Sequence, residues 1–275
     1  MNSRKIKGAE DFFGKILLNF PECEGIFQRG KENFDMENYF WNTQLANQQQ
    51  RMNQPMNQRP LSIYLAGDLF DSKDISGNLM LARAIEAGSC GRYAVKLPQD
   101  GECEVVSRTS QSIRDADFEL LFNCDVIVAN FDGDDLDSGT VVEFCFAKMV
   151  DMPAVLLRTD FRDSGDHTLP DGSPWNLMCS HYPRTVVRHI NAMQLYHECR
   201  KVPGTAAELL AGYYSRIAGS VITALDEAVS QKSWLEDEEL FGQYCRAVKS
   251  IGGTLPELLD ENALKQIVCR RLCKG

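Results

Sequence analysis

The chain has 275 residues and a formal net charge of -10, which leaves room for one sizeable domain with attachments or for two small domains. The acidic charge balance argues against a nucleic-acid backbone or an anionic membrane surface as partner. The sequence holds no apolar run of about eighteen residues, and its N-terminus is not followed by a signal-peptide core, so we expect a cytoplasmic protein with no membrane partner.

Strands and helices are predicted to alternate from residue 62 to residue 189. Short apolar runs predict strands at 62–67, 93–97, 126–131, 153–158 and 185–189. Apolar residues at helical spacing predict helices at 78–87, 110–122 and 141–150. We therefore expect an α/β fold, a Rossmann-like or flavodoxin-like parallel sheet with helices on both faces. The glycine pattern after the first predicted strand is not that of a dinucleotide site, because Gly67 stands alone where Gly-x-Gly-x-x-Gly would be needed.

The chain on either side of this α/β domain, which we place at residues 61–202, is predicted to form two extensions. Residues 1–60 are interpreted as an N-terminal extension, because its final part is an Asn/Gln-rich linker that cannot build a core. Residues 203–275 are expected to form a helical C-terminal extension, with helices at 206–232, 237–251 and 258–272. We expect the apolar stripes of these helices to serve packing or subunit contacts.

The predicted helix at 141–150 is apolar almost all the way round, and Asp137 or Ser138 can cap its start. Glu143 lies inside this apolar sequence. A carboxylate in such surroundings costs several kcal/mol unless it is paired, hydrogen-bonded or used. It also follows the carboxyl end of a strand, where open α/β sheets bind ligands. Glu143 is therefore a candidate functional residue, and the plainer alternative is a glutamate at the helix margin, exposed or paired with a basic residue.

Carboxylates cluster at the predicted strand ends, and we select Asp117 and Glu143 as a pair, supported by Asp137, Tyr64 and Asn176. Two carboxyl groups on either side of one bond are the usual equipment for cleaving a glycosidic bond. Each residue also has a plainer interpretation. Asp117 would be a solvated charge on a polar helix face, Asp137 a helix N-cap, Tyr64 a core residue and Asn176 a turn residue.

Other kinds of site are less well supported by the sequence. The acidic loop at 132–137 has carboxylates suited to Ca²⁺ or Mg²⁺, but it lacks the spacing and the terminal glutamate of an EF-hand loop. The four histidines, His167, His181, His189 and His197, have no metal-ligand spacing. The predicted chemistry requires neither a metal nor an organic cofactor.

Four pieces of sequence together resemble the signature of the nucleoside 2-deoxyribosyltransferase family. They are Tyr64-Leu-Ala-Gly67, Asp117 placed eight residues before Asp125, Asp137-Ser-Gly-Thr-Val-Val-Glu143, and Pro174-Trp-Asn-Leu-Met178. The resemblance covers roughly residues 61 to 188. It implies a transfer of 2-deoxyribose between nucleobases in two steps, through a covalent sugar-enzyme intermediate, as part of nucleoside salvage.

The resemblance also implies a role for each catalytic candidate. Glu143 would be the nucleophile, which attacks C1′ of a 2′-deoxynucleoside and releases the base. Asp117 would hydrogen-bond the departing and incoming base and carry its proton. Tyr64 would orient Glu143 through its hydroxyl. A nucleophilic carboxylate must be ionised, so Glu143 needs such a donor.

Further residues would bind the substrate. The resemblance implies that Asp137 holds the sugar 5′-hydroxyl and that Asn176 reaches the same hydroxyl from a neighbouring subunit. The protein would then be a homo-oligomer with active sites shared between subunits. Gln99 and Phe70, at loop ends on the same rim as Gly67, are expected to line the pocket for the base. The expected partners are small-molecule nucleosides and nucleobases.

Two other functions stay open at this point. The first is an N-glycoside hydrolase of 2′-deoxynucleosides or their 5′-monophosphates, with water as acceptor. Asp137 would repel a phosphate, which favours the free nucleoside. The second is a non-catalytic nucleotide-sensing module that kept the fold. The joint presence of Tyr64, Asp117, Asp137 and Glu143 argues against a sensor, which has no need of a nucleophile.

Overall fold

The computed structural model describes residues 59–101, 109–162 and 172–272. Almost all of the predicted N-terminal extension, including its Asn/Gln-rich linker, lies outside the described residues. The described residues belong to one compact unit. Within the described part of the chain, no helix is long and apolar enough to cross a membrane.

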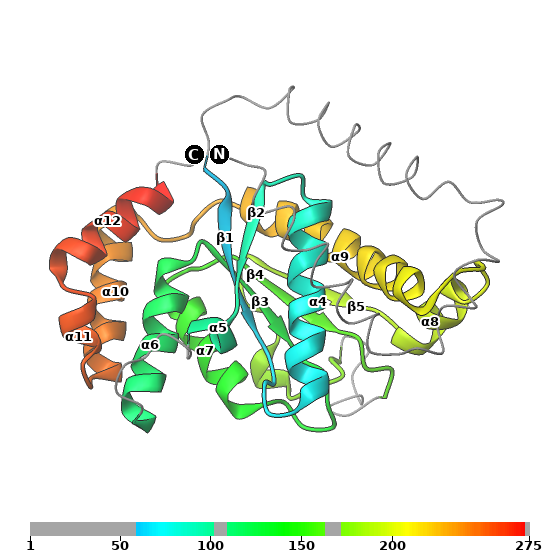
Figure 1. The fold of residues 1–275 in the computed structure, drawn as a ribbon. Helices are drawn as coiled ribbons and strands as arrows, with labels where there is room; N and C mark the ends of the chain where they lie inside the picture. Colours follow the sequence, from blue (N-terminus) through cyan, green and yellow to red (C-terminus); the bar gives the residue numbers. More distant parts are fainter. Residues whose placement is uncertain (1–58, 102–108, 163–171, 273–275) are drawn as a thin grey trace, which may run out of the picture. The chain divides into compact units, whose positions relative to one another are not determined.

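Five parallel strands form one sheet in the order β2-β1-β3-β4-β5 (Figure 1). The strands are β1 (Leu61–Ala66), β2 (Tyr93–Lys96), β3 (Val126–Asn130), β4 (Ala154–Arg158) and β5 (Thr185–His189). This strand order is that of flavodoxin-like folds, so the predicted fold class is confirmed. The chain reverses direction across the sheet between β1 and β3, and ligands of open α/β sheets bind at the carboxyl edge of such a pair.

Side chains of successive strand residues point to opposite faces of the sheet and fill two separate cores. One core contains Tyr64 and Ile127, and the other contains Ile63 and Val128. All four side chains are fully buried. The sheet is therefore covered on both faces, as its near-continuous apolar strands require.

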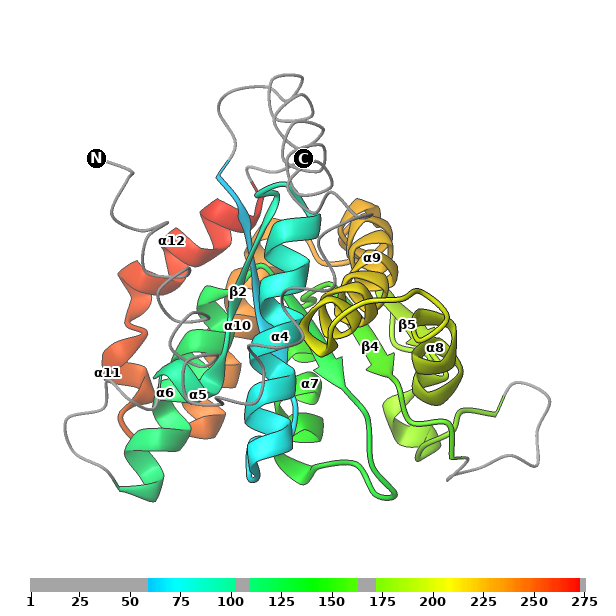
Figure 2. The same ribbon diagram turned by 45° about the vertical axis from the view of Figure 1, so that its right-hand side comes forward.

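Two groups of helices cover these faces (Figures 1 and 2). The core around Tyr64 is closed by α6 (Ser110–Asn123), α7 (Ser138–Met149), α10 (Asp237–Ile251), α11 (Leu255–Leu258) and α12 (Glu261–Leu272). The core around Ile63 is closed by α4 (Ser72–Gly88), α8 (Ala192–Cys199) and α9 (Ala206–Ser230), and α9 lies against α4. Helices after residue 203 thus contribute to both cores of the sheet, while the proposed domain boundaries stay a prediction.

Several helices differ from the sequence-based expectation. Helix α4 begins six residues early, because Asp71 accepts bonds from the amides of Lys73 at 2.6 Å and Asp74 at 3.1 Å and so caps the helix at Ser72. The helix expected at 258–272 begins three residues later than predicted and is preceded by a short separate helix. The structure has α11 and then α12, which starts where Asp260 accepts a bond from the amide of Ala263 at 2.8 Å.

Three short elements were not expected from the sequence. They are α5 (Pro98–Gly101), η3 (Leu177–Cys179) and α8. The first two have four and three residues, too few to give a periodic pattern. Both affect the site, since α5 contains Gln99 and η3 begins directly after Asn176.

Candidate active site

A hydrogen bond joins Tyr64 on β1 to Glu143 on α7. The Tyr64 hydroxyl donates to Oε1 of Glu143 at 2.5 Å. The contact follows from the topology. Strands β1 and β3 are neighbours, and α7, which follows β3, packs on the face to which Tyr64 points. Tyr64 is fully buried, whereas Glu143 keeps partial access to solvent. The sheet thus holds a hydroxyl donor directly against the candidate nucleophile.

Burial and nearby charges change the protonation of Glu143. Burial raises the pKa of Glu143 to about 7, against an opposing effect of the Tyr64 hydrogen bond, and the charges of Asp117 and Asp137 raise this pKa further. Burial also raises the pKa of Tyr64 well above its ordinary value, with added contributions from Glu143 and Asp117. Tyr64 therefore keeps its proton and acts as a donor. The pKa of Glu143 thus lies near neutral pH, where catalytic acids and bases commonly titrate.

Asp117 lies on α6 and is partly buried. Its charge raises the pKa of both Tyr64 and Glu143, so its carboxylate lies within electrostatic range of the pair. The next residue, Phe118, is buried in the core against Phe146 of α7, with ring centroids 5.2 Å apart. This packing holds α6 beside α7. The catalytic role of Asp117 stays a prediction.

Asp137 is the N-cap of α7. Its Oδ2 atom accepts bonds from the amide of Thr140 at 2.6 Å and from the Thr140 hydroxyl at 2.9 Å. Asp137 is therefore a helix cap, as its plainer interpretation predicts, and its binding of a sugar hydroxyl stays a prediction. A carboxylate has a second oxygen with its own lone pairs. Capping and binding of a sugar hydroxyl are compatible.

Asp68, in the loop after β1, and Asp137, at the start of α7, form an acidic rim. A Cβ at Gly67 would lie 3.2 Å from the Cβ of Asn130 on β3, so a larger residue at Gly67 would push the two strand ends apart. Burial raises the pKa of the following residue, Asp68, and the charge of Asp137 raises it further. Asp68 was missed in the sequence analysis. Two acidic residues in adjacent loops are the signal that could have found it.

Gln99 and Phe70, which were expected to line the base pocket, differ in their surroundings. The Gln99 amide donates to the carbonyl of Ile75 on α4 at 3.2 Å, so α5 and α4 are joined there. The Phe70 side chain is 78% exposed. A large aromatic ring so exposed beside Gly67 is free to contact a ligand or another chain. Their roles in base binding stay predictions.

Asn176 is exposed and caps η3, where its Oδ1 atom accepts a bond from the amide of Met178 at 3.0 Å. The neighbouring Leu177 and Met178 are 53% and 69% exposed. Trp175, by contrast, is buried against Phe131, with ring centroids 5.3 Å apart. The segment is thus anchored by its tryptophan and presents the next three residues outward. The place of Asn176 in the site of a neighbouring subunit stays a prediction.

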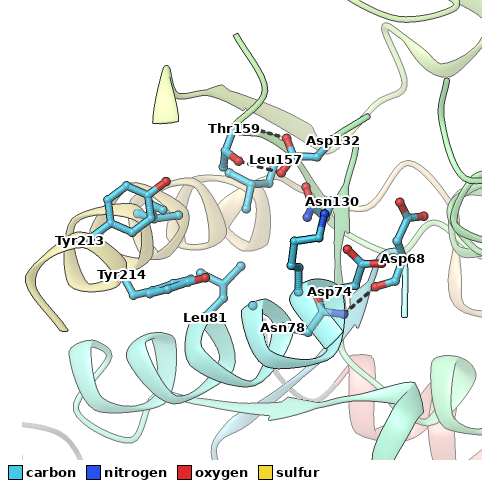
Figure 3. A pocket seen from close by; sticks show the side chains of 13 residues that line it. Asp68, Asp74, Asn78, Leu81, Asn130, Asp132, Leu157, Thr159, Tyr213 and Tyr214 are labelled. Carbon is cyan, nitrogen blue, oxygen red and sulfur yellow. Dashed lines mark hydrogen bonds between the residues drawn. The ribbon is translucent and has the colours of Figure 1, made fainter. Parts of the chain in front are cut away.

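A cavity of about 210 Å³ lies at the carboxyl edge on the opposite face of the sheet from Tyr64. In Figure 3, Tyr213 and Tyr214 of α9 close one end, and Asp68 lies at the other end. The remaining lining residues are Lys73, Asp74, Gly77, Asn78, Leu81, Asn130, Asp132, Leu157, Thr159 and Ile217. Asp68 therefore belongs both to the lining of this cavity and to the acidic rim, and the sequence analysis had not identified the cavity.

Comparison with known proteins agrees with the motifs. Residues 63–178 match the family model described as nucleoside 2-deoxyribosyltransferase. This segment is therefore similar to the nucleoside 2-deoxyribosyltransferase family. The matched segment holds Tyr64, Asp117, Asp137, Glu143 and Asn176. Strand β5 and the helices after it lie beyond the match.

Two solved structures also show similarity to part of this chain. A conserved protein from Enterococcus faecalis V583 is 24% identical, with a TM-score of 0.40, and the match covers 52% of this chain and 99% of that one. A 2-deoxyribosyltransferase from Leishmania mexicana is 21% identical, with a TM-score of 0.38, and the match covers 46% of this chain and 90% of that one. The comparison with curated proteins gave no match.

Proposed function

We propose that this protein is a nucleoside 2-deoxyribosyltransferase that moves 2-deoxyribose between nucleobases. The observation that carries the proposal is the contact of the Tyr64 hydroxyl with Glu143 at 2.5 Å, beside the charge of Asp117. This arrangement supplies a nucleophile, a donor that orients it and a second carboxyl group for proton transfer. Together with the family match, it favours glycosyl transfer over binding alone.

The first half of the proposed reaction forms the covalent intermediate. The ionised Glu143 attacks C1′ of the deoxynucleoside, and a C–O bond forms as the C–N glycosidic bond breaks. The electron pair of the broken bond moves to the base, and Asp117 supplies a proton to the departing base. Tyr64 keeps one oxygen of Glu143 occupied, so the other oxygen is presented to the sugar.

The second half reverses these steps with another base. Asp117, now ionised, accepts the proton that the incoming base loses as its nitrogen attacks C1′. The Glu143–sugar bond breaks, and the carboxylate returns to its contact with Tyr64. The acidic rim of Asp68 and Asp137 suits an uncharged sugar, because two carboxylates would repel a 5′-phosphate. The proposed substrates are therefore free nucleosides.

The decisive experiment is a chromatographic assay of the purified protein with 2′-deoxyinosine, with and without adenine. Transfer predicts deoxyadenosine only when adenine is present. Mass spectrometry without acceptor should then detect a 2-deoxyribosyl adduct on Glu143. Glu143→Gln should abolish both products. Glu119→Gln on α6 is the matched control, since Glu119 is also a partly buried glutamate whose pKa burial raises, and it should leave turnover unchanged.

Other outcomes of this assay would reject the proposal in favour of a different function. Hypoxanthine released equally with and without adenine would indicate a hydrolase. Absence of turnover with several nucleosides and monophosphates would instead indicate a nucleotide sensor.

We also propose that the active protein is a homo-oligomer in which Asn176 completes the site of a neighbouring subunit. Support comes from the exposure of Leu177 and Met178 beside Asn176, and of Val142 on α7 next to Glu143, since such apolar side chains suit a subunit interface. Mixing two inactive variants, Glu143→Gln and Asn176→Ala, tests the idea. Shared sites predict partial recovery of activity in the mixture, because some sites then receive both intact residues. No recovery would contradict sharing.

A further inference from the structure

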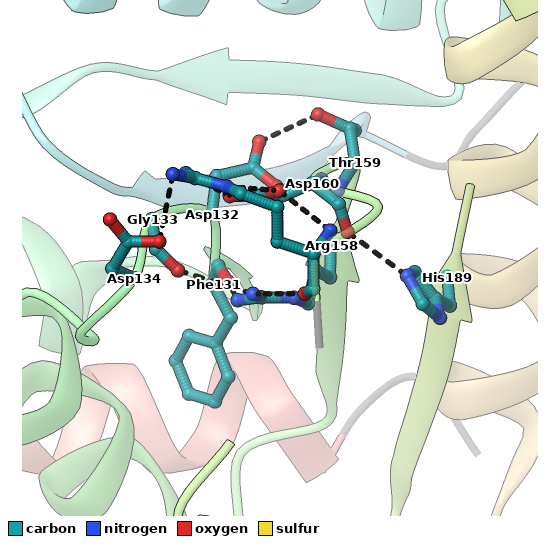
Figure 4. A network of polar contacts seen from close by, with 9 residues as sticks. Phe131, Asp132, Gly133, Asp134, Arg158, Thr159, Asp160 and His189 are labelled. Atoms are coloured by element: carbon teal, nitrogen blue, oxygen red, sulfur yellow. Dashed lines mark hydrogen bonds and ion pairs between the residues drawn. The ribbon is translucent and has the colours of Figure 1, made fainter. Parts of the chain in front are cut away.

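Arg158, the last residue of β4, has a completely buried side chain. Figure 4 shows its guanidinium group between two loops at the carboxyl edge of the sheet. It donates to the carbonyl oxygens of Phe131, of Gly133 at 3.1 Å and of Arg162 at 3.0 Å. Burying a guanidinium costs free energy that an apolar residue would not. A residue retained at that cost calls for a role other than filling space.

A second set of bonds joins the loop after β3 to the loop after β4, and here the residue of the first loop accepts. Asp132 accepts bonds from the amide of Thr159 at 2.5 Å, from the Thr159 hydroxyl at 2.7 Å and from the amide of Asp160 at 2.7 Å. Arg162 adds an ion pair to Asp134 in the other loop at 2.7 Å, and it also pairs with Asp160 of its own loop at 2.5 Å. The loop after β3 and the loop after β4 are thus clamped together by charged groups from both sides.

The clamped loop leads directly to Asp137. It starts at Phe131 and ends at the N-cap of α7, six residues later. Glu143 has other supports, because Phe144 next to it is fully buried and Tyr64 bonds its carboxylate directly. Asp137 lies at the end of the loop, so its position depends on the loop more than the position of Glu143 does. A loosened clamp should therefore displace Asp137 before it displaces Glu143.

We propose that Arg158 is a positioning residue, which holds loop 131–137 so that the Asp137 carboxylate meets the 5′-hydroxyl of the nucleoside. This inference rests on the proposed function. It adds a specificity determinant that has no contact with the substrate and acts through the loop. The guanidinium is matched to the task, since its rigid fork of donors can bond several carbonyl oxygens at once, whereas a lysine would present a single ammonium group.

The test compares two substrates that differ only in the group Asp137 would hold. Arg158→Met is assayed with 2′-deoxyinosine and with 2′,5′-dideoxyinosine. We expect KM for 2′-deoxyinosine to rise about tenfold, a modest part of the loss that a misplacement of about 1 Å can cause. KM for the 5′-deoxy substrate should change little, because it never used Asp137. A general loss of structure would instead raise KM for both substrates equally.

Arg184→Met is the matched control. Arg184 is also largely buried, and it bonds the backbone carbonyl of Asp151 at 2.8 Å and its carboxylate at 2.7 Å, next to the amino end of β4. Its loss should lower stability without discriminating between the two substrates. Equal KM changes for both substrates in Arg158→Met, as in Arg184→Met, would overturn the proposal.

A second variant and a second measurement keep the test valid if Arg158→Met folds poorly. Thr159→Val removes only the hydroxyl bond to Asp132, and we expect the same substrate discrimination at a smaller size. Hydrogen exchange of residues 131–137 should be faster in both variants, and unchanged exchange would overturn the clamp. If the wild-type protein shows no turnover, the proposed function fails, while the exchange measurement still decides for or against the clamp.

Discussion

The Tyr64 hydroxyl and the Glu143 carboxylate are hydrogen-bonded at 2.5 Å although they are 79 positions apart in the sequence. The bond counteracts burial, which raises the pKa of Glu143 to about 7. Without the hydroxyl, the carboxylate would lose a donor that favours its ionised form. The pair therefore sets how much of the proposed nucleophile is ionised at neutral pH.

The first prediction concerns Tyr64→Phe, which removes only this hydroxyl. The pKa of Glu143 should rise, because the hydrogen bond no longer opposes the effect of burial. At pH 7 we expect kcat/KM to fall by about tenfold or more, the usual size for a lost hydrogen bond to a charged group. The acid limb of the pH profile of kcat/KM should also move to higher pH.

Tyr93→Phe is the control for this prediction. Tyr93 is buried in β2, and its hydroxyl donates to Asp226 at 2.8 Å on the other side of the sheet. Its loss should leave the pH profile in place. An acid limb that stays where it is in Tyr64→Phe would contradict the assigned role of Tyr64.

The second prediction links the pKa of Glu143 to stability. The ordinary pKa of a glutamate is 4.5, and burial raises the pKa of Glu143 to about 7 in the folded protein. Between these values the folded state binds more protons than the unfolded state, so the contribution of Glu143 to stability falls as pH rises from 4.5 to about 7. Glu143→Gln should therefore be more stable than wild type at pH 8, by about 1–3 kcal/mol.

Urea unfolding at a series of pH values measures this difference. The advantage of Glu143→Gln should shrink on going from about pH 8 down to about pH 4, where the wild-type carboxyl group is neutral in both states. A constant difference across this range would mean that Glu143 has an ordinary pKa. The gain would also indicate that the active site holds a residue unfavourable for folding, as proposed nucleophiles often are.

The sheet was predictable because its strands are buried on both faces. Strand β3, for example, is four buried residues followed by Asn130, which gives the short apolar run that the sequence analysis used. Helix α8 was missed because only Leu195 is buried in it, while Met193 and Tyr196 are exposed. Its apolar residues do stand at helical spacing, but the pattern extends over only eight residues, too short to predict a helix from periodicity.

Candidate residues for the site could be selected from the sequence, and the family resemblance also implied the contact between Tyr64 and Glu143, while the roles of these residues stay predictions. Glu143 stood out as a carboxylate in an apolar helix, and the family resemblance supplied Tyr64. Their contact depends on which strands are neighbours, and local periodicity does not contain that information. Arg158 was not noticed, since one charged residue after an apolar run is also typical of a strand end at the surface. Its burial depends on two loops that fold over it.

The third prediction concerns Asp115, a buried carboxylate that joins α6 to the C-terminal helices. It accepts bonds from the Thr254 amide at 2.7 Å and the Thr254 hydroxyl at 2.8 Å, and it pairs with Arg114 at 2.5 Å. Burial acts to raise the pKa of Asp115, but the bonds from Arg114 and Thr254 outweigh it and hold this pKa below its usual value. Asp115→Asn should cost about 1–3 kcal/mol of stability at pH 7.

The pH dependence of this loss has the opposite sign to that of Glu143. A lowered folded pKa contributes stability that is present above the unfolded value and is lost as pH falls through the folded value. The difference in the free energy of unfolding between wild type and Asp115→Asn should therefore become smaller below about pH 4. Chemical unfolding of both proteins at pH 7 and at pH 3 measures this difference. An equal difference at both pH values would exclude the proposed ionic contribution of Asp115.

The fourth prediction separates the two roles of Asp137. Serine caps helices about as well as aspartate, so Asp137→Ser should keep the bond to the Thr140 amide and change stability by less than about 0.5 kcal/mol. It removes the carboxylate that would hold the 5′-hydroxyl and repel a 5′-phosphate. We expect KM for 2′-deoxyinosine to rise and turnover of 2′-deoxyinosine 5′-monophosphate, absent in wild type, to become measurable.

Asp137→Ala completes the comparison, because it removes both the cap and the carboxylate. It should lose about 1 kcal/mol of stability and bind 2′-deoxyinosine no better than Asp137→Ser. Steady-state kinetics with both substrates and thermal unfolding of both variants provide the readouts. If Asp137→Ser matched wild type with both substrates, Asp137 would be a helix cap alone, and the recognition of the free 5′-hydroxyl would have to come from other residues of the acidic rim, with Asp68 the nearest candidate.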